Sequence, residues 1–439
     1  MRAPESRPAD VADPAGAAPD LPDDSMPARL ARLGTASGED DAGGTSDAGE
    51  RLGSYTWTAD GQRSRVATVE RATGADLTPL TQPGPVADPE DLRGNIENYI
   101  GLTQVPTGVI GPVRVAGSAA RGDFYVPLAT TEGALVASFN RGAKATREAG
   151  GITSVCLAEE VQRAPVFQFG SLPAVGAFLQ WVSGQRARFD EVVRQTSRYA
   201  RLTDVGMRVE GNNATLVFGY TCGDAAGQNM VTLCTDRICA YILAECPERP
   251  RRFFVEGNYS GDKKATALSL AHVRGKKVTA EAHLPRGVVE GTLATTAEKL
   301  RQYWVTAATG IAQSGALGLQ GHIANGLAAL YLACGQDVAC VAESAVGITR
   351  YEPTGDGGVY IAVTLPALTV GTVGGGTRFA TQAACLDVLG CRGAGHARKF
   401  AEICAAVVLC GELSISAALA SGQFARAHAA FGRRAARGA

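Results

Sequence analysis

Long apolar runs and export signals are scarce in this sequence. A membrane-spanning helix needs about 18 or more consecutive apolar residues, whereas the best apolar stretch, Ile403 to Cys410, is short and lies between Glu402 and Glu412. The opening residues, MRAPESRPAD, lack the apolar core of a secretory signal. We therefore expect a chain that neither crosses a membrane nor is exported.

Paired cysteines and an excess of one charge are also missing. The 11 cysteines occur singly, without a CxxC pair or a ladder of Cys and His residues, so the sequence predicts neither a metal site nor a disulfide scaffold. A reducing cytoplasm is the expected location. Lysine and arginine total 42 against 43 acidic residues, and this balance gives no general attraction to nucleic acid or to an anionic membrane.

What the sequence does contain is typical of a large globular protein. With 439 residues, 45% of them apolar, the chain is long enough for two or three packed units. Residues 1–60 carry 12 acidic residues against five arginines. Such a stretch offers too little apolar surface to offset its chain entropy, so we expect residues 1–61 to form a disordered acidic tail.

Local patterns predict several elements. The stretch 63–81 suits a short amphipathic helix that ends at the turn signal QPGP. A second helix is expected after ATT, with Thr130 or Thr131 as its N-cap and Gly150 and Gly151 at its end. Strand-like and helical runs alternate between about 165 and 255, which indicates a small α+β unit set into a larger one. The chain ends in a long apolar helical region that is followed by basic residues.

Nine unusual strings follow one another in the order and approximate spacing that one enzyme family shows. They are ENYIG at 97–101, PTGVIGPV at 106–113, ATTEGALVAS at 129–138, DAAGQNM at 224–230, GNYSGDKK at 257–264, GQD at 335–337, GTVGGGT at 371–377, GELS at 411–414 and His428. One glycine loop alone would be weak support, but nine ordered motifs over more than 300 residues are specific. The chain resembles the class I hydroxymethylglutaryl-CoA (HMG-CoA) reductases. The residues of the motifs DAAGQNM and GNYSGDKK resemble those of class I more than those of class II.

The resemblance implies an α+β fold in which a large domain, built around a long central helix, carries an inserted ferredoxin-like small domain. By alignment, 62–100 form a small helical N-terminal domain, 101–163 with 266–434 form the large domain for CoA and substrate, 165–255 form the NADP(H)-binding domain, and 435–439 form a basic tail. It also implies a homodimer, or a dimer of dimers, with active sites shared between subunits.

The implied reaction is the NADPH-dependent reduction of an acyl-CoA thioester to an alcohol, HMG-CoA to mevalonate, in two hydride transfers through a hemithioacetal and an aldehyde. Lys263 matches the lysine that stabilises the oxyanion, Glu132 the glutamate that transfers a proton to the aldehyde, and Asp337 the aspartate that links these two. His428 matches the histidine that protonates the departing CoA thiolate. The other histidines are interpreted as structural: His272, His283, His322 and His396.

Binding residues follow from the same resemblance. Arg141 and Lys144 lie three residues apart and give the helix after Glu132 a cationic face suited to CoA phosphates. The positions that match the CoA-contact helix are Ser138, Asn140, Arg141 and Lys144. Those that match the nucleotide site are Ser197, Arg198, Asp224, Gly227, Asn229 and Arg433, and an arginine near the ribose favours NADPH over NADH. The substrate positions are Arg163, Asp262, Lys264 and Asn325, while GTVGGGT suggests a close backbone approach beside the active site.

Two groups expected in the substrate pocket are missing. Glu256 stands where the family has a serine before GNY, and Ala307 stands at the aligned position of a pocket lysine. Both changes disfavour a substrate carboxylate, since removing one member of a buried charge pair costs roughly 3 to 5 kcal/mol. Three functions stay open: HMG-CoA reductase, a reductase of another acyl-CoA or carrier-protein thioester, and a non-catalytic homologue that binds CoA or nucleotide. The four intact reacting residues argue against the third.

Overall fold

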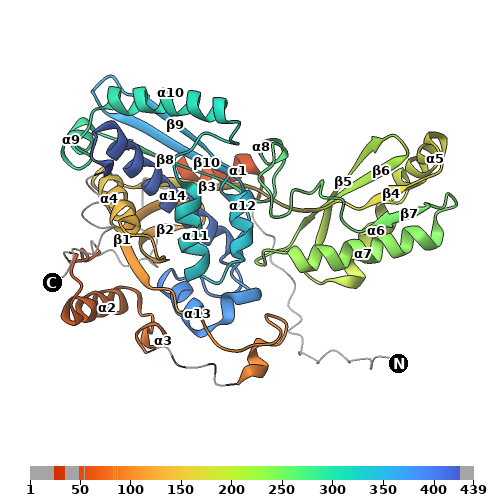
Figure 1. Cartoon of the computed structure of the whole chain (residues 1–439), viewed down its shortest axis with the longest axis horizontal. Coiled ribbons are helices and arrows are strands. Elements are labelled where there is room, and N and C mark those ends of the chain that lie inside the picture. The colour runs from red at the N-terminus through yellow and green to blue at the C-terminus, as the bar shows by residue number, and fades with distance from the viewer. Residues whose placement is uncertain are drawn as a thin grey trace, which may run out of the picture.

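The computed structural model describes residues 24–34, 49–53, 55–82, 84, 86 and 88–425. In Figure 1 a large body carries a smaller α+β lobe that projects from one side. The two are joined by β3 (Ile152–Arg163), which pairs with β8 (Gly275–Leu284) of the large sheet and, over its last three residues, with β6 (Asn213–Thr221) of the lobe. The expected α+β fold with an inserted small domain is confirmed.

The large sheet has the strand order β2-β1-β3-β8-β10-β9 and is antiparallel except between β1 and β3. Its other strands are β1 (Thr107–Gly117), β2 (Arg121–Ala129), β9 (Ile348–Pro353) and β10 (Val359–Leu368). Buried and partly accessible side chains alternate along much of β8 and β10, as expected for strands that turn one face to a core.

The long central helix is α14 (Ala397–Ala420), which packs on β3, β8 and β10. By length and composition it could span a membrane, but 83% of its apolar segment is buried inside the protein, which identifies it as a core helix. The long helical region expected here is confirmed, and Glu402 and Glu412 are both fully buried within it. The Glu402 carboxylate accepts three backbone N–H groups and the Glu412 carboxylate accepts two, which makes their burial tolerable.

Helix α4 (Leu135–Glu148) crosses α14 at very short range, because a Cβ on Gly142 would lie 1.9 Å from the carbonyl oxygen of Cys410. The expected N-cap at Thr130 or Thr131 is wrong. Ala134 takes a left-handed conformation, with φ 71°, and helical structure begins only after it. The Thr130 hydroxyl instead accepts the Glu132 N–H at 3.0 Å, so Glu132 sits on the turn that precedes α4.

The lobe has the ferredoxin-like topology that the resemblance implied. Its sheet runs β7-β4-β6-β5 with antiparallel neighbours, and helices connect β4 to β5 and β6 to β7, which is the βαββαβ arrangement. The remaining elements are β4 (Val166–Gln168), α5 (Leu172–Ser183), α6 (Arg186–Thr196), β5 (Arg201–Glu210), α7 (Gln228–Glu245) and β7 (Arg252–Phe254). All of them lie within the expected limits of 165–255.

Short and medium helices cover the large sheet. Helix α11 packs on β2 and α14, whereas α10 packs on β9 and α14. The helices are α8 (Leu268–Ala271), α9 (Arg286–Gly291), α10 (Ala297–Ser314), α11 (Ile323–Ala333), α12 (Val341–Ser344) and α13 (Ala380–Val388), with 3₁₀ turns η1 (Pro89–Leu92), η2 (Val338–Cys340) and η3 (Gly375–Arg378). Near the N-terminus, α2 (Ala59–Thr73) and α3 (Thr78–Thr81) form a small helical unit that packs on Tyr125 of β2.

A further helix, α1 (Met26–Gly34), corrects the expected disorder of residues 1–61. Arg29 on this helix is only 8% exposed and donates to the carbonyl oxygen of Cys156 in β3 at 2.9 Å. The same guanidinium pairs with Asp24 at 3.1 Å and lies 3.8 Å from Glu159. These contacts with β3 stabilise a helix that the composition of the segment does not predict.

All 11 cysteines are buried free thiols. Burial raises the pKa of every one of them. These side chains therefore act as small apolar packing groups and not as nucleophiles.

Candidate active site

Lys263 lies on a turn of the segment that joins the lobe to β8. Its Nζ is 2.8 Å from Oδ2 of Asp337, and this hydrogen bond raises the pKa of Lys263, so the ammonium is charged at neutral pH. Both side chains are about half exposed, at 45% and 48%. A charged and accessible ammonium, held in place by a carboxylate, is suited to stabilising an oxyanion.

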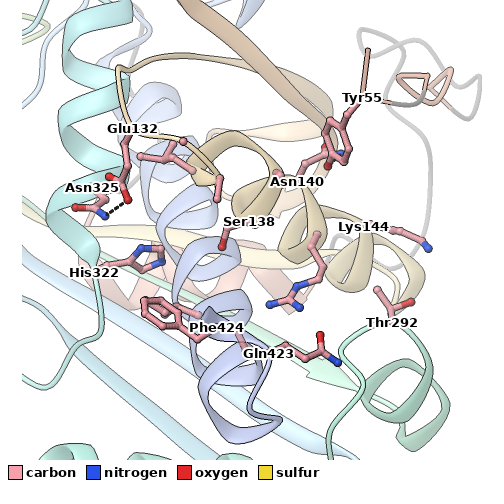
Figure 2. A pocket seen from close by; sticks show the side chains of 17 residues that line it. Tyr55, Glu132, Ser138, Asn140, Lys144, Thr292, His322, Asn325, Gln423 and Phe424 are labelled. Atoms are coloured by element: carbon pink, nitrogen blue, oxygen red, sulfur yellow. Dashed lines mark hydrogen bonds between the residues drawn. The ribbon is translucent and has the colours of Figure 1, made fainter. Parts of the chain in front are cut away.

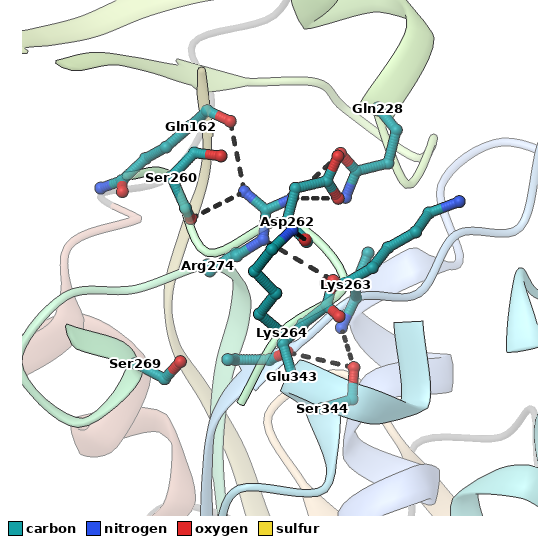
Figure 3. A network of polar contacts seen from close by, with 12 residues as sticks. Gln162, Gln228, Ser260, Asp262, Lys263, Lys264, Ser269, Arg274, Glu343 and Ser344 are labelled. Carbon is teal, nitrogen blue, oxygen red and sulfur yellow. Dashed lines mark hydrogen bonds and ion pairs between the residues drawn. The ribbon is translucent and has the colours of Figure 1, made fainter. Parts of the chain in front are cut away.

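The turn that carries Lys263 rests on a buried polar network, drawn in Figure 3. Asp262 accepts from Nη1 of Arg163 at 2.9 Å and from Nη2 of Arg274 at 2.7 Å. Both arginines are at most 5% exposed. Burial alone would raise the pKa of Asp262, but the two guanidinium groups lower it, so the carboxylate is ionised. Two of the expected substrate residues, Arg163 and Asp262, are thus engaged with each other, while Lys264 is exposed.

Glu132 lines a different cavity, of about 720 Å³, shown in Figure 2. Asn325 on α11 donates from Nδ2 to Oε1 of Glu132 at 3.3 Å. The cavity is walled by α4, by the beginning of α11 and by the end of α14 with Phe424 beyond it. Its lining also includes all four residues expected to contact CoA: Ser138, Asn140, Arg141 and Lys144. The structure brings these residues together with Glu132 and Asn325.

The cationic residues of α4 have different surroundings. Arg141 donates from Nε to the Ser414 hydroxyl of α14 at 3.0 Å and from Nη2 to the carbonyl oxygen of the same residue. Lys144 is more exposed and lies 3.7 Å from Glu148. Arg141 therefore joins the two helices at the cavity wall, and Lys144 is the cation of α4 that remains more accessible to a ligand.

A second cavity, of about 500 Å³, adjoins the first through Asn140 and Lys144. Its lining adds Arg51, Arg114 and Arg147. The last two are paired with a single carboxylate, that of Asp123, and the whole lining carries four basic side chains against the acidic Glu50 and Glu148. The two cavities share part of their lining, and the excess of cations in the second suits phosphate groups.

His322 is a candidate that the sequence interpretation treated as structural. The residue precedes α11, its ring lies in the wall of the Glu132 cavity, and the ring centroid is 5.1 Å from that of Phe139. Burial lowers the pKa of His322, although Glu132 acts in the opposite direction, so the ring is neutral. Its Nε2 is buried without a hydrogen-bond partner in the described chain. Spacing could have indicated it, since His322 and Asn325 are three residues apart.

The motif DAAGQNM forms the turn before α7 and the first residues of that helix. Gly227 is the N-cap, with φ 85°, no side chain caps the helix, and Asn229 is exposed in its first turn. The uncapped N–H groups suit a pyrophosphate. Asp224 differs from expectation, because its carboxylate accepts N–H groups of Gly395 and Ala397 at 2.7 and 3.0 Å. It joins the lobe to the start of α14.

The GTVGGGT loop touches this turn through its backbone. A Cβ on Gly371 would lie 2.5 Å from the nitrogen of Ala226, and the N–H of Thr372 donates to the carbonyl oxygen of Asp224 at 2.8 Å. The expected close approach is present. On the lobe itself, Ser197 follows α6 and accepts N–H groups of the next turn, and Arg198 is exposed.

The clusters around Glu132 and Lys263 lie at opposite ends of α11. Asn325 is in the first turn of that helix, whereas Asp337 follows its last residue. Eleven residues at a rise of 1.5 Å separate the two ends by about 16 Å. Within one chain Asp337 therefore contacts Lys263 but not Glu132, and its expected link to Glu132 stays a prediction.

Three further positions were singled out in the sequence. His428 and Arg433 lie outside the described residues. Ala307 is on α10, where it lines a small cavity of about 10 Å³ with Trp304 and Glu412. Its surroundings in one chain are those of a packing residue.

Comparison with known proteins identifies the family. A family model described as hydroxymethylglutaryl-coenzyme A reductase matches residues 61–433. The 3-hydroxy-3-methylglutaryl-coenzyme A reductases of Pyrococcus abyssi and Aeropyrum pernix are each 44% identical to this chain, over 79% and 83% of it and 86% and 88% of their own lengths. A solved class II reductase from Streptococcus pneumoniae, bound to NADPH, has a TM-score of 0.64 at 18% identity and covers 83% of this chain and 100% of that chain. At that identity the likeness shows the fold alone.

The matched span contains both the Lys263 turn and the Glu132 cavity. It also contains the lobe and the sheet that position them, and the archaeal relatives align over most of their own length. This chain belongs to the hydroxymethylglutaryl-coenzyme A reductase family.

Proposed function

We propose that this protein reduces HMG-CoA to mevalonate with NADPH as hydride donor. The observation that carries the proposal is the Lys263 ammonium, which is charged, accessible and held by Asp337 at 2.8 Å. Each of the two hydride transfers places negative charge on the former carbonyl oxygen, and this ammonium would stabilise that charge. The names of the archaeal relatives support the choice of substrate.

The residues of the chain have separate roles in this proposal. NADPH, when bound, supplies the hydride. The uncapped start of α7 would hold its pyrophosphate and Arg198 its 2′-phosphate. Glu132, hydrogen-bonded to Asn325, would transfer a proton to the aldehyde, and His428 would protonate the CoA thiolate. The two cavities beside α4 would hold the pantetheine arm and the phosphates of CoA.

We also propose a homodimer of the class I type. Because α11 keeps the Glu132 and Lys263 clusters about 16 Å apart, a complete site needs Glu132 of one subunit beside Lys263 of another. The motifs DAAGQNM and GNYSGDKK support the class I assignment. Eleven free thiols suit a reducing cytoplasm.

The proposal is tested by following NADPH oxidation by the purified protein with HMG-CoA. We expect thioester-dependent oxidation of two NADPH for each mevalonate formed. Omission of the thioester, and replacement of NADPH by NADH, are the controls. If NADPH is not oxidised with HMG-CoA or with any of a panel of other acyl-CoA thioesters, the protein is not a thioester reductase and only a binding function is left.

A second candidate, reduction of a different thioester, is favoured by Glu256. Its Oε2 lies 3.4 Å from Nη1 of Arg163 and accepts from the Ser260 hydroxyl at 2.9 Å. A carboxylate in this place offsets the charge of Arg163 and would compete with a substrate carboxylate. A thioester with a neutral or cationic distal end would avoid that competition.

The Glu256→Ser variant separates the two candidates. If another thioester is the substrate, the variant should lower the KM for HMG-CoA about tenfold, since an anion beside the substrate is removed. If HMG-CoA is the natural substrate, the wild type already has a micromolar KM and the variant gains nothing. Glu210→Ser, an exposed acid on β5 of the lobe, is the matched control.

A further inference from the structure

Two buried arginines share one side-chain acceptor at the junction of the lobe and the large domain. Oε1 of Gln228 accepts from Nη2 of Arg274 at 3.0 Å and from Nη2 of Arg163 at 3.3 Å. Gln228 is the first residue of α7. The start of the proposed nucleotide-binding helix is thereby attached to the network beneath Lys263.

Arg274 also reaches the lysine turn directly. Its Nη2 donates to Oδ1 of Asp262 at 2.7 Å, and its Nη1 donates to the carbonyl oxygens of Ser260 at 3.3 Å and Gln162 at 3.2 Å. One planar guanidinium thus fixes β3, α7 and the turn relative to one another, a geometry that a lysine cannot reproduce. The side chain is 3% exposed, so water does not screen these contacts.

The network is not one that stability alone would select. Glu343 on α12 is fully buried 3.6 Å from Nε of Arg274, and neither carboxylate oxygen has a hydrogen-bond partner in the described chain. Nε of Arg274 and Nε2 of Gln228 also lack partners there. Buried charged groups with incomplete hydrogen bonding usually cost stability compared with an apolar core. Their arrangement is better explained by the position that they impose on the turn.

We propose that Gln228 and Arg274 are positioning residues that set the start of α7 and the Lys263 ammonium in one geometry, so that hydride donor and oxyanion stabiliser are aligned. The inference rests on the proposed function for the roles of α7 and Lys263. It adds that the two roles are coupled through the contact between Gln228 and Arg274, beside the parallel contacts of Arg163 with Gln228 and Asp262.

The test uses Gln228→Met and Arg274→Lys in the full chain, with HMG-CoA and NADPH. Met keeps the length of Gln but cannot accept hydrogen bonds from the two guanidinium groups. Lys keeps the positive charge of Arg but cannot donate several hydrogen bonds in one plane. We expect kcat to fall about tenfold to hundredfold, while the KM for HMG-CoA and the Kd for NADPH stay within about threefold. The fold-decrease in kcat of the double variant should be smaller than the product of the two single fold-decreases, because both changes break the same contact.

Matched controls come from the same chain. Gln185→Met removes an acceptor of the Tyr241 hydroxyl elsewhere in the lobe, and Arg29→Lys alters another buried arginine that binds a backbone carbonyl. Both should keep kcat within about twofold of the wild type. If kcat falls as much in the two control variants as in the two test variants, the effect is general destabilisation and the inference is overturned.

Hydrogen exchange gives a readout that does not depend on activity. In both test variants the amides of 257–266 should exchange at least about tenfold faster, with α14 unchanged. Unchanged exchange in this segment, or equally faster exchange in α14, overturns the inference. If the wild type reduces HMG-CoA and both variants have the same kcat as the wild type, the inference is overturned and the proposed function still stands. A wild type that reduces no thioester overturns the proposed function, and exchange then decides whether Gln228 and Arg274 position the turn.

Discussion

Lys263 combines a constrained backbone with an accessible charge. Its φ of 54° is left-handed, a conformation that costs a residue other than glycine about 1–3 kcal/mol. The surroundings impose it, because the neighbouring Asp262 is held between Arg163 and Arg274. Strain at a half-exposed lysine paired with Asp337 points to a position determined by chemistry and not by folding.

Replacing this ammonium should affect turnover far more than folding. In Lys263→Met we expect kcat with HMG-CoA to fall about 10²–10³-fold, because the oxyanion loses its cation, with the melting temperature within a few degrees of the wild type. Lys299→Met, an exposed lysine on α10, is the control and should retain full activity. Steady-state kinetics and thermal melts measure both, and a kcat within about threefold of the wild type would remove Lys263 from the mechanism.

Glu412 should give the protein a measurable pH dependence of stability. Burial raises the pKa of this carboxyl from 4.5 to about 7, so the folded protein binds the proton more tightly than the unfolded chain does. The stabilising effect is complete below about pH 4.5 and is lost as the pH rises through about 7, a change of about 3 kcal/mol.

The Glu412→Gln variant removes this titration while one amide oxygen still accepts a backbone N–H. From pH 5 to pH 7.5 the free energy of unfolding of the wild type should fall relative to that of the variant, as measured by urea unfolding. Glu298→Gln, an exposed acid on α10, should show the wild-type profile. Parallel profiles for wild type and Glu412→Gln would mean that Glu412 has no raised pKa.

At the scale of single residues, sequence motifs located the reacting groups but not their partners. Lys263 and Asp337 were recognised because GNYSGDKK and GQD are specific strings. Arg274 and Gln228 were not singled out, since their importance lies in contacts between segments distant in sequence. Asp224 was placed in a nucleotide site because of its motif, whereas its carboxylate binds the start of α14.

At the scale of elements, the contribution of α1 to stability can be tested, since the composition of residues 1–61 predicted disorder there. The helix precedes the matched family span and is attached to β3 and α14 by Arg29 and Asp24, the latter also paired with Arg398. Deleting residues 1–34 leaves these partners exposed. We expect the free energy of unfolding to fall by about 2 kcal/mol, while kcat stays within about twofold.

Deletion of residues 1–23 is the matched control for α1, because it spares Asp24 and the helix. Denaturant unfolding of the two truncated proteins measures the difference. Equal stability of both would show that α1 does not contribute to the fold. A lower kcat in the longer deletion alone would instead place α1 in communication with the site.

Periodicity predicted the type of most elements better than their limits. The lobe was recognised as an α+β insertion because strand-like and helical runs alternate there, but its strand order depends on pairing between distant segments. The long helical region at the end of the chain was predicted, but the burial of Glu402 and Glu412 within it was not, because N–H groups of segments distant in sequence satisfy them. The start of α4 was misplaced because Ala134 adopts a left-handed conformation that alanine rarely takes.

At the scale of the whole molecule, the separation of Glu132 from Lys263 along α11 makes the subunit arrangement testable. If each site takes Glu132 from one subunit and Lys263 from another, Glu132→Gln and Lys263→Met subunits should complement each other. A mixed dimer then has one intact site and one with both changes. Mixing equal amounts through refolding or co-expression should restore about a quarter of wild-type activity.

Each variant alone is the control for this complementation and should be nearly inactive. A mixture no more active than the two variants separately would place both residues in one site of one chain. Size-exclusion chromatography of the mixture checks that mixed dimers have formed.

The burial of all 11 thiols has a practical consequence. A maleimide probe should leave the native protein unlabelled, because every thiol is shielded and its raised pKa suppresses the thiolate. A single new cysteine, such as Asn229→Cys at the exposed start of α7, would then carry a fluorophore without removal of any native cysteine. Changes in the surroundings of the start of α7 on addition of NADPH could be followed in the otherwise unmodified protein.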